Sequence, residues 1–240
     1  MVAPAIAGAS RSSTNTAGTS HVLDWTTVPL GTVNPGDLLL ILMNTGSTAN
    51  TLNSHADYTE LLDESGIAGA LKILYRWATG GETAPTLVTS ASTRSAEITY
   101  RITGAEDPAI QVPQIGTTAA TTDPPSITPT GGPKDFLYIA MVGSTGEQAD
   151  DGTYVTVFPT NYTESQQEKT CGVAGTNLGG LVGAAGRRTT ASTTENPSAF
   201  TVSEAASRTQ TIAIHPGPPG LGAGRLFVLS GPAMRRSSRW

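Results

Sequence analysis

Asp37-Leu-Leu-Leu-Ile-Leu-Met43 is the stretch of sequence that decides the fold. The turn Asn34-Pro-Gly36 precedes it and Gly46 follows it, so turn-forming residues stand on both sides. A continuous apolar run of this length is typical of a strand buried on both faces or of a short buried helix. The flanking proline and glycines favour the strand, because these residues mark turns and disfavour a helix interior.

Two further segments, 70–77 and 96–102, alternate between apolar and polar residues. Such a pattern indicates half-buried antiparallel strands with one face towards the core. The apolar faces consist of Leu71, Ile73, Tyr75 and Trp77 in the first segment and of Ala96, Ile98, Tyr100 and Ile102 in the second. The polar faces, which we expect to lie in solvent, consist of Lys72 and Arg76 and of Glu97, Thr99 and Arg101.

The composition agrees with a protein made of strands and turns. Charged residues make up 14% of the 240 residues, against about 25% in an average globular domain. Serine and threonine are abundant, and the chain has 27 glycines and 16 prolines. Many β-branched residues and many turn formers favour an all-β fold. The length suits one large β-sandwich or two small domains.

The second half of the chain repeats sequence patterns of the first. Pro133-Lys-Asp-Phe-Leu-Tyr-Ile-Ala-Met141 corresponds to the stretch 35–43, and Asn161-Tyr-Thr-Glu164 corresponds to Asp57-Tyr-Thr-Glu60. Two copies of this kind can form one double-sheet sandwich or two tandem ones, and the spaced apolar residues of the connector 104–132 favour one. We therefore predict an antiparallel, jelly-roll-like β-sandwich over residues 21–216, with an internal pseudo-duplication of about residues 21–104 and 120–216.

Both ends of the chain differ from this body. Residues 1–20 are small, rich in serine and threonine and without periodicity, which predicts an extended N-terminal arm. Residues 217–240 begin with a Gly/Pro spacer and predict a C-terminal docking tail. Its expected partner-binding residues are Arg225, Leu226, Phe227, Val228, Leu229, Arg235, Arg236, Arg239 and Trp240. The apolar run can add as a strand to a partner's sheet, and arginine and tryptophan are enriched at interface hot spots.

Charge and hydropathy exclude two classes of partner. The net charge is −5. The tail carries four arginines and no acid, so the rest of the chain has ten basic and 19 acidic groups, a net charge of −9. Nucleic-acid affinity comes mainly from neutralising phosphates, so we expect no nucleic-acid partner. The longest apolar stretch, Leu38 to Met43, is six residues, too short to span a membrane. Residues 1–9 lack the features of a signal peptide.

Residues for catalysis or metal binding are sparse. His21, His55 and His215 are widely spaced and are expected to be surface or turn residues, so no zinc site is expected. Cys171 is the only cysteine and lies in a glycine-rich loop without the context of a catalytic thiol. We therefore predict no enzyme activity, no catalytic residue, no bound metal and no cofactor.

Two acidic features leave alternatives open. The pairs Asp63-Glu64 and Asp150-Asp151 could serve a glycosidase, but aromatic residues, which line sugar clefts, are only 5% of the chain. The loop Glu147 to Gly152 could hold Ca²⁺, although it lacks the ligand order of an EF-hand.

Of the three tryptophans, Trp25 and Trp77 are expected in the core.

Four stretches carry a resemblance to a known family: Ala70-Leu-Lys-Ile-Leu-Tyr-Arg-Trp-Ala-Thr-Gly80, Glu82 to Pro85, Ile98-Thr-Tyr-Arg-Ile-Thr-Gly104 and Asp107-Pro108. Together they resemble a β-sandwich module of bacteriophage virion proteins and bacterial surface proteins. Lys134 to Met141 resembles a later strand of the same module. The resemblance covers about residues 22–215 and departs at Leu181 to Arg188, where aromatic residues give way to glycine and alanine. It implies a structural or adhesive role and brings no catalytic residues.

These observations lead to an expected function. The chain is interpreted as a bacteriophage virion structural protein that decorates or cements the capsid surface or attaches to the tail. Its expected partners are capsid or tail subunits and further copies of itself, with a trimer as one arrangement. It would assemble in the host cytoplasm and reside on the virion surface. The alternatives are a carbohydrate-binding adhesin or tail-fibre module that binds a host-surface glycan, and a glycan hydrolase or esterase.

Overall fold

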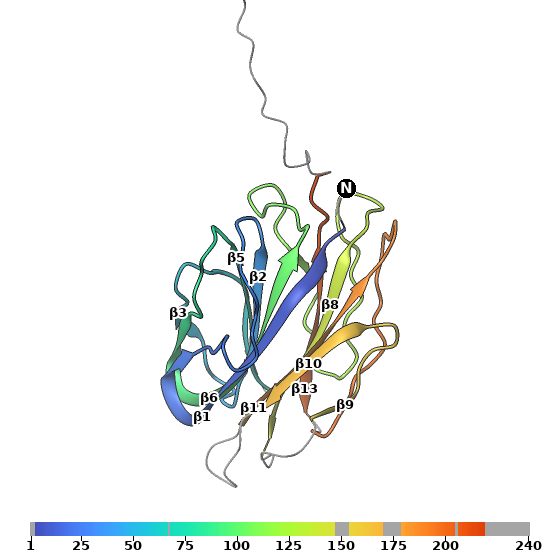
Figure 1. Ribbon diagram of the computed structural model, residues 1–240. Coiled ribbons are helices and arrows are strands. Elements are labelled where there is room, and N and C mark those ends of the chain that lie inside the picture. Colours follow the sequence, from blue (N-terminus) through green and yellow to red (C-terminus); the bar gives the residue numbers. More distant parts are fainter. Residues whose placement is uncertain (1–2, 67, 147–153, 170–178, 205, 219–240) are drawn as a thin grey trace, which may run out of the picture.

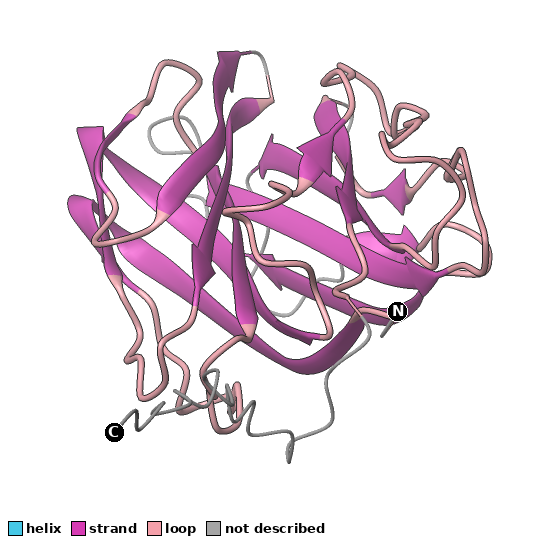
Figure 2. Cartoon of the chain, turned by 90° about the horizontal axis from the view of Figure 1, so that it is seen from above, coloured by secondary structure: helices cyan, strands magenta, loops and turns pink. Residues whose placement is uncertain are grey.

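The computed structural model describes residues 3–66, 68–146, 154–169, 179–204 and 206–218. These residues contain strands and loops but no helix (Figure 2). The strands are β1 (Ala5–Val22), β2 (Leu38–Thr45), β3 (Leu52–Ser54), β4 (Thr59–Gly66), β5 (Gly69–Trp77), β6 (Thr86–Thr103), β7 (Gln114–Ile115), β8 (Leu137–Gly146), β9 (Val155–Val157), β10 (Thr163–Lys169), β11 (Gly179–Arg188), β12 (Thr201–Val202) and β13 (Ser207–Ile214).

Two antiparallel sheets pack face to face as a sandwich (Figure 1). The first sheet has the order β1-β6-β2-β5-β4, with β3 added beside β6, and the second has the order β10-β11-β8-β13-β7. Strands β9 and β12 form a separate pair. The predicted all-β sandwich is confirmed. The jelly-roll connectivity is not found, because every strand of the first sheet precedes every strand of the second, whereas a jelly roll passes back and forth between its sheets.

The order of strands is the same in the two sheets. Read from one edge, β1, β6, β2, β5 and β4 match β7, β13, β8, β11 and β10. The strands β2 and β8, which contain the two matching apolar stretches of the sequence, occupy the central position of their sheets. This is the arrangement that a pseudo-duplication predicts, and the duplication itself stays a prediction.

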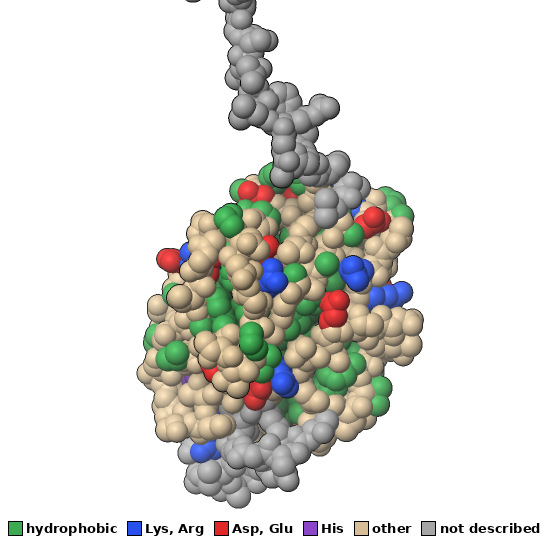
Figure 3. Space-filling view, viewed as in Figure 1, with side chains coloured by type: hydrophobic (Ala, Val, Ile, Leu, Met, Phe, Trp, Pro, Cys, Tyr) green, Lys and Arg blue, Asp and Glu red, His purple; other side chains and the backbone are tan. Residues whose placement is uncertain are grey.

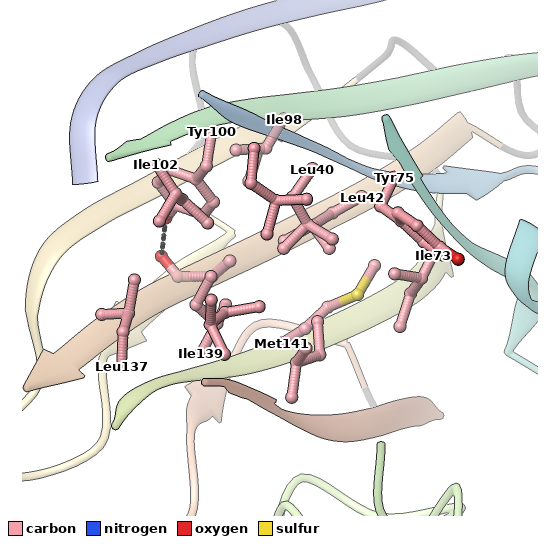
Figure 4. Close-up of a cluster of buried hydrophobic side chains, with 14 of the residues drawn as sticks. Leu40, Leu42, Ile73, Tyr75, Ile98, Tyr100, Ile102, Leu137, Ile139 and Met141 are labelled. Atoms are coloured by element: carbon pink, nitrogen blue, oxygen red, sulfur yellow. Dashed lines mark hydrogen bonds between the residues drawn. The ribbon is translucent and has the colours of Figure 1, made fainter. Parts of the chain in front are cut away.

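The central strand β2 is buried on both faces, as its continuous apolar run predicts. It pairs with β5 and β6, so that Leu40 lies opposite both Tyr75 and Tyr100. These side chains point into the space between the sheets, where they meet β8 residues such as Ile139 and Met141 (Figure 4). The inner faces predicted for β5 and β6 are confirmed, because their apolar residues belong to this cluster.

A second apolar layer covers the outer face of the first sheet. Loop residues Leu23, Leu30 and Val33 pack there against Ile41 and Leu74. A similar layer covers the outer face of the second sheet. The residues expected in solvent therefore lie inside the protein, and that prediction is wrong for Lys72, Glu97 and Thr99, which are all buried. Arg76 and Arg101 are half-buried and paired with Asp57 and Asp37.

The predicted N-terminal arm is also wrong, because Ala5–Val22 forms β1 and pairs along the length of β6. The strand also forms hydrogen bonds to the loop that follows it, since the Ser10 hydroxyl donates to the Asp24 carbonyl oxygen over 2.9 Å. An edge strand needs no continuous apolar face, which explains the missing periodicity. Strand β1 ends at Val22, and Asp24 then accepts hydrogen bonds from a tight turn that contains Trp25.

The sandwich extends slightly further at its C-terminal end than predicted. Pro216 bridges to Ala105, and the Gly217 amide donates to the Gly104 carbonyl oxygen over 2.8 Å. A side chain at position 217 would lie 2.8 Å from the Ala105 carbonyl oxygen, so glycine permits this close approach. The predicted tail therefore begins after Gly217, and its expected docking residues from Arg225 to Trp240 lie outside the described residues.

Candidate functional site

Several residues with a predicted role lie beyond the part of the chain that the structure describes. They are the tail residues Arg225 to Trp240, the acidic loop Glu147 to Gly152 and Cys171. On the face shown in Figure 3, basic and acidic side chains are interspersed among uncharged ones. Two clefts on the described surface combine polar and apolar groups, and we name them the rim cleft and the loop cleft.

The rim cleft has a volume of about 420 Å³ and lies where β5 ends and β4 begins. Its lining consists of Asp57, Thr59, Tyr75, Arg76, Trp77, Asp107, Pro108 and Ala109. Tyr75 and Trp77 are the last two inward residues of β5, so strand alternation brings both aromatic rings to the same side. Trp77 packs against the main core cluster, as predicted, and it also borders this cleft.

The polar groups of the rim cleft come from two turns. Asp107 accepts the Ala109 amide over 2.9 Å, which holds the turn after β6. Asp57 has a φ of 37°, a left-handed conformation that is uncommon outside glycine. Its carboxylate lies 3.3 Å from the Arg76 guanidinium, yet the side chain is 83% exposed. The cleft thus combines aromatic rings with accessible carboxylate acceptors, a mixture that suits a polar ligand with apolar faces.

The loop cleft has a volume of about 520 Å³ and lies over the outer face of the first sheet, between residues 23–33 and 81–84. Its polar groups are engaged within the protein. The Trp25 indole N–H donates to the Thr99 hydroxyl over 3.2 Å, and the Glu82 carboxylate accepts the amides of Thr79 and Gly80. Trp25 is half-buried and packs on the outer apolar layer, so it stands outside the main core. This cleft offers mainly apolar contact.

A buried hydrogen-bonded chain connects His21 to two hydroxyl groups. Its Nδ1 lies 2.7 Å from the Ser95 Oγ, and its Nε2 lies 3.0 Å from the Thr89 Oγ1. Burial, helped by the charge of Lys72, lowers the pKa of His21 to about 4. The imidazole is fully buried, so this Ser–His contact has no access to a substrate. The expectation of surface histidines is wrong for His21 and also for His215, which is buried against Phe136.

The rim cleft is not predicted by the sequence patterns. Asp57 belongs to a repeated motif and Asp107 belongs to the resemblance, but neither pattern indicates a site. The signal available was the pair of inward aromatic residues at the end of the 70–77 segment. Their meeting with the 107–109 turn depends on the path of the chain after β6, which local patterns do not reveal.

Among the described residues, no cluster of three or more histidine, cysteine, aspartate or glutamate side chains is arranged to hold a metal ion. The same residues contain no helix long and apolar enough to cross a membrane. Comparison with protein-family models, curated proteins and solved structures found no match to this chain.

Proposed function

We propose that this chain is a bacteriophage virion structural protein that acts through protein–protein contacts at the capsid surface or on the tail. The observation that carries the proposal is the set of backbone hydrogen bonds that hold residues 215–217, immediately before the tail, on the sandwich. The Glu106 amide donates to the His215 carbonyl oxygen over 2.9 Å, next to the Gly217 to Gly104 hydrogen bond. Hydrogen bonds thus fix the chain to the sandwich up to Gly217, immediately before the sequence of the tail.

The chemistry of the tail indicates what it would bind. It has four arginines, one apolar run and a terminal tryptophan, and no acid follows Glu204. An acidic surface is the complementary partner, because opposite charges steer association and fix its register. The rest of the chain carries a net charge of −9, so a neighbouring copy can supply acidic groups. A neighbouring copy in an oligomer, such as a trimer, or a capsid or tail subunit would satisfy this requirement.

The test is removal of residues 219–240, which leaves Gly217 and its hydrogen bond in place. We expect a soluble body whose melting temperature is nearly that of the full chain but which no longer forms oligomers or enters virions. The matched variant keeps the full length and replaces Arg225, Arg235, Arg236 and Arg239 with glutamine. Normal assembly of the truncated protein would contradict a docking role for the tail.

The rim cleft supports a second candidate, a receptor-binding module for a host-surface glycan. Sugar rings stack on aromatic side chains, and their hydroxyl groups donate to carboxylates, which Tyr75, Trp77, Asp57 and Asp107 would provide. We expect purified host polysaccharide to bind the protein in calorimetry and Asp57→Ala with Asp107→Ala to weaken it at least tenfold. The exposed Asp123→Ala is the matched control. Equal binding by all variants excludes the cleft, and shortening of the polysaccharide would indicate a hydrolase instead.

A further inference from the structure

Lys72 and Asp63 form a buried pair between two neighbouring strands of the first sheet. They lie directly opposite each other in the register of β5 and β4. The Lys72 side chain is 0% exposed and that of Asp63 is 11% exposed. The Lys72 Nζ is in direct contact with the Asp63 Oδ1 and donates to the Asn50 carbonyl oxygen over 2.8 Å. The second carboxylate oxygen, Oδ2, accepts the Leu52 amide over 2.8 Å.

Stability alone is a weak reason for a lysine at this place. Lys72 sits beside Met43 in β2, on the face that the outer apolar layer covers. The free-energy cost of removing both charges from water is nearly as large as the gain from their attraction. Replacing such a buried pair with apolar residues of similar volume therefore often leaves the stability of a protein unchanged. Burial also lowers the pKa of Lys72. Loss of a proton from Lys72, which gives the neutral and nucleophilic amine, therefore costs less free energy here than in water.

We propose that Lys72 and Asp63 are joined by an intramolecular amide bond. A proton passes from the Lys72 ammonium to the Asp63 carboxylate, and the neutral Nζ then attacks the Asp63 Cγ. The bond from Cγ to one oxygen breaks, and that oxygen takes a second proton from the nitrogen and leaves as water. An ammonium and a carboxylate thus become one amide and one water molecule, and no other reactant is consumed.

The surroundings of the pair favour each part of this step. The β4–β5 register holds the Lys72 nitrogen against the Asp63 carboxylate, and this fixed proximity lowers the activation that a free amine and acid would need. The Leu52 amide stabilises the negative charge that develops on the Asp63 Oδ2 during attack. The Asn50 carbonyl oxygen orients the amine. The partial exposure of Asp63 gives the water molecule a way out.

The other ion pairs of the described chain provide an internal comparison. Five of them use an arginine, whose guanidinium does not form an amide under these conditions. The remaining lysine pair, Lys134 with Glu106, is separated by 4.0 Å and is more exposed. The proposed bond would tie β4, which is an edge strand, to β5. It would therefore hold the edge of the sheet at a place where strands otherwise separate first.

The test is the intact mass of the denatured full-length protein. We expect a mass lower than that of the sequence by one water molecule, whereas Lys72→Arg should have its full sequence mass. In Asp63→Asn the same amide would form with loss of ammonia, so its mass should equal that of the linked wild-type protein. A wild-type mass equal to that of the sequence would overturn the proposal, whether or not the variants fold.

Peptide mapping locates the missing water. A protease that cleaves after glutamate cuts at Glu64, between the two residues. If the bond exists, the peptides that contain Asp63 and Lys72 remain linked as one branched species, and trypsin fails to cleave after Lys72. A mass lower by one water with these peptides unlinked would mean dehydration elsewhere in the chain and would also overturn the proposal.

Discussion

Glu97→Gln is expected to make the protein more stable at neutral pH. Glu97 is 1% exposed in β6, and the Ser12 hydroxyl of β1 donates to its Oε2 over 3.3 Å. Burial raises the pKa of Glu97 to about 8; hydrogen bonds from Ser95 and Ser12 oppose the rise, and the Glu168 charge adds to it. The folded protein therefore keeps this carboxyl group protonated at neutral pH. Glutamine has nearly the same shape and never ionises.

The sign and the size of the effect follow from linkage. A carboxyl whose pKa is higher in the folded state contributes its full stability below the unfolded value of 4.5 and loses it as pH rises towards 8. Each pKa unit corresponds to about 1.4 kcal/mol. The loss is thus about 3 kcal/mol at pH 7 and about 5 kcal/mol above pH 8. These are large fractions of a typical unfolding free energy of about 5–15 kcal/mol.

The assay is urea unfolding of the wild-type protein and Glu97→Gln at pH 4, 6, 7 and 9, followed by tryptophan fluorescence. We expect similar unfolding free energies at pH 4 and an advantage of the variant that grows to about 3 kcal/mol at pH 7. Other titrating groups cancel in this difference. The surface variant Asp123→Asn is the control and should stay within about 0.5 kcal/mol of wild type throughout. A difference that does not change with pH would refute a buried, protonated Glu97.

Three other predictions test the core and the acid response. Leu40→Ala should lower the unfolding free energy by about 2–5 kcal/mol, while Val22→Ala, 66% exposed, should change it by less than about 0.5 kcal/mol; equal effects in urea titrations would contradict the face assignments. The Tyr100 hydroxyl lies 3.2 Å from the Ala184 carbonyl oxygen (Figure 4), so Tyr100→Phe should cost about 1–2 kcal/mol, and an unchanged melting temperature would exclude this bond. Because burial lowers the pKa of His21 to about 4, its contribution is complete above pH 6.5 and falls by about 3 kcal/mol as pH drops to 4; calorimetry should show His21→Gln to be less acid-sensitive than wild type.

The strands with an apolar face were predictable because alternation is a local property. In β5 and β6 each second residue points between the sheets, and the identity of those residues suffices to assign the face. The continuous run in β2 indicated burial on both sides, which its central position explains. The same reasoning predicted the matching β8. These assignments need no knowledge of what covers the sheet.

The environment of the opposite face was not predictable in this way. Lys72 and Glu97 alternate with apolar residues, as in a strand open to water, but both are buried. Lys72 contacts the Asn50 carbonyl oxygen of a distant loop, and Glu97 contacts Ser12 of β1. Likewise β1 has no apolar periodicity that would predict a strand. Its place at the sheet edge depends on pairing with β6, more than 60 residues away along the chain. The rim cleft depends on the same kind of long-range meeting. Only the three-dimensional path of the chain reveals these features.

Because loops cover the outer face of the first sheet, each polar side chain on that face needs a hydrogen-bond partner, an opposite charge or an uncharged form. Thr99 receives a hydrogen bond from the Trp25 indole, and His21 stays neutral between two hydroxyl groups. Glu97 retains its proton, as its raised pKa indicates. Lys72 has a carboxylate, Asp63, in direct contact. An amide bond is the most complete form of neutralisation, since it removes both charges permanently. The burial that makes Glu97 sensitive to pH is therefore the same condition that would drive Lys72 and Asp63 to condense.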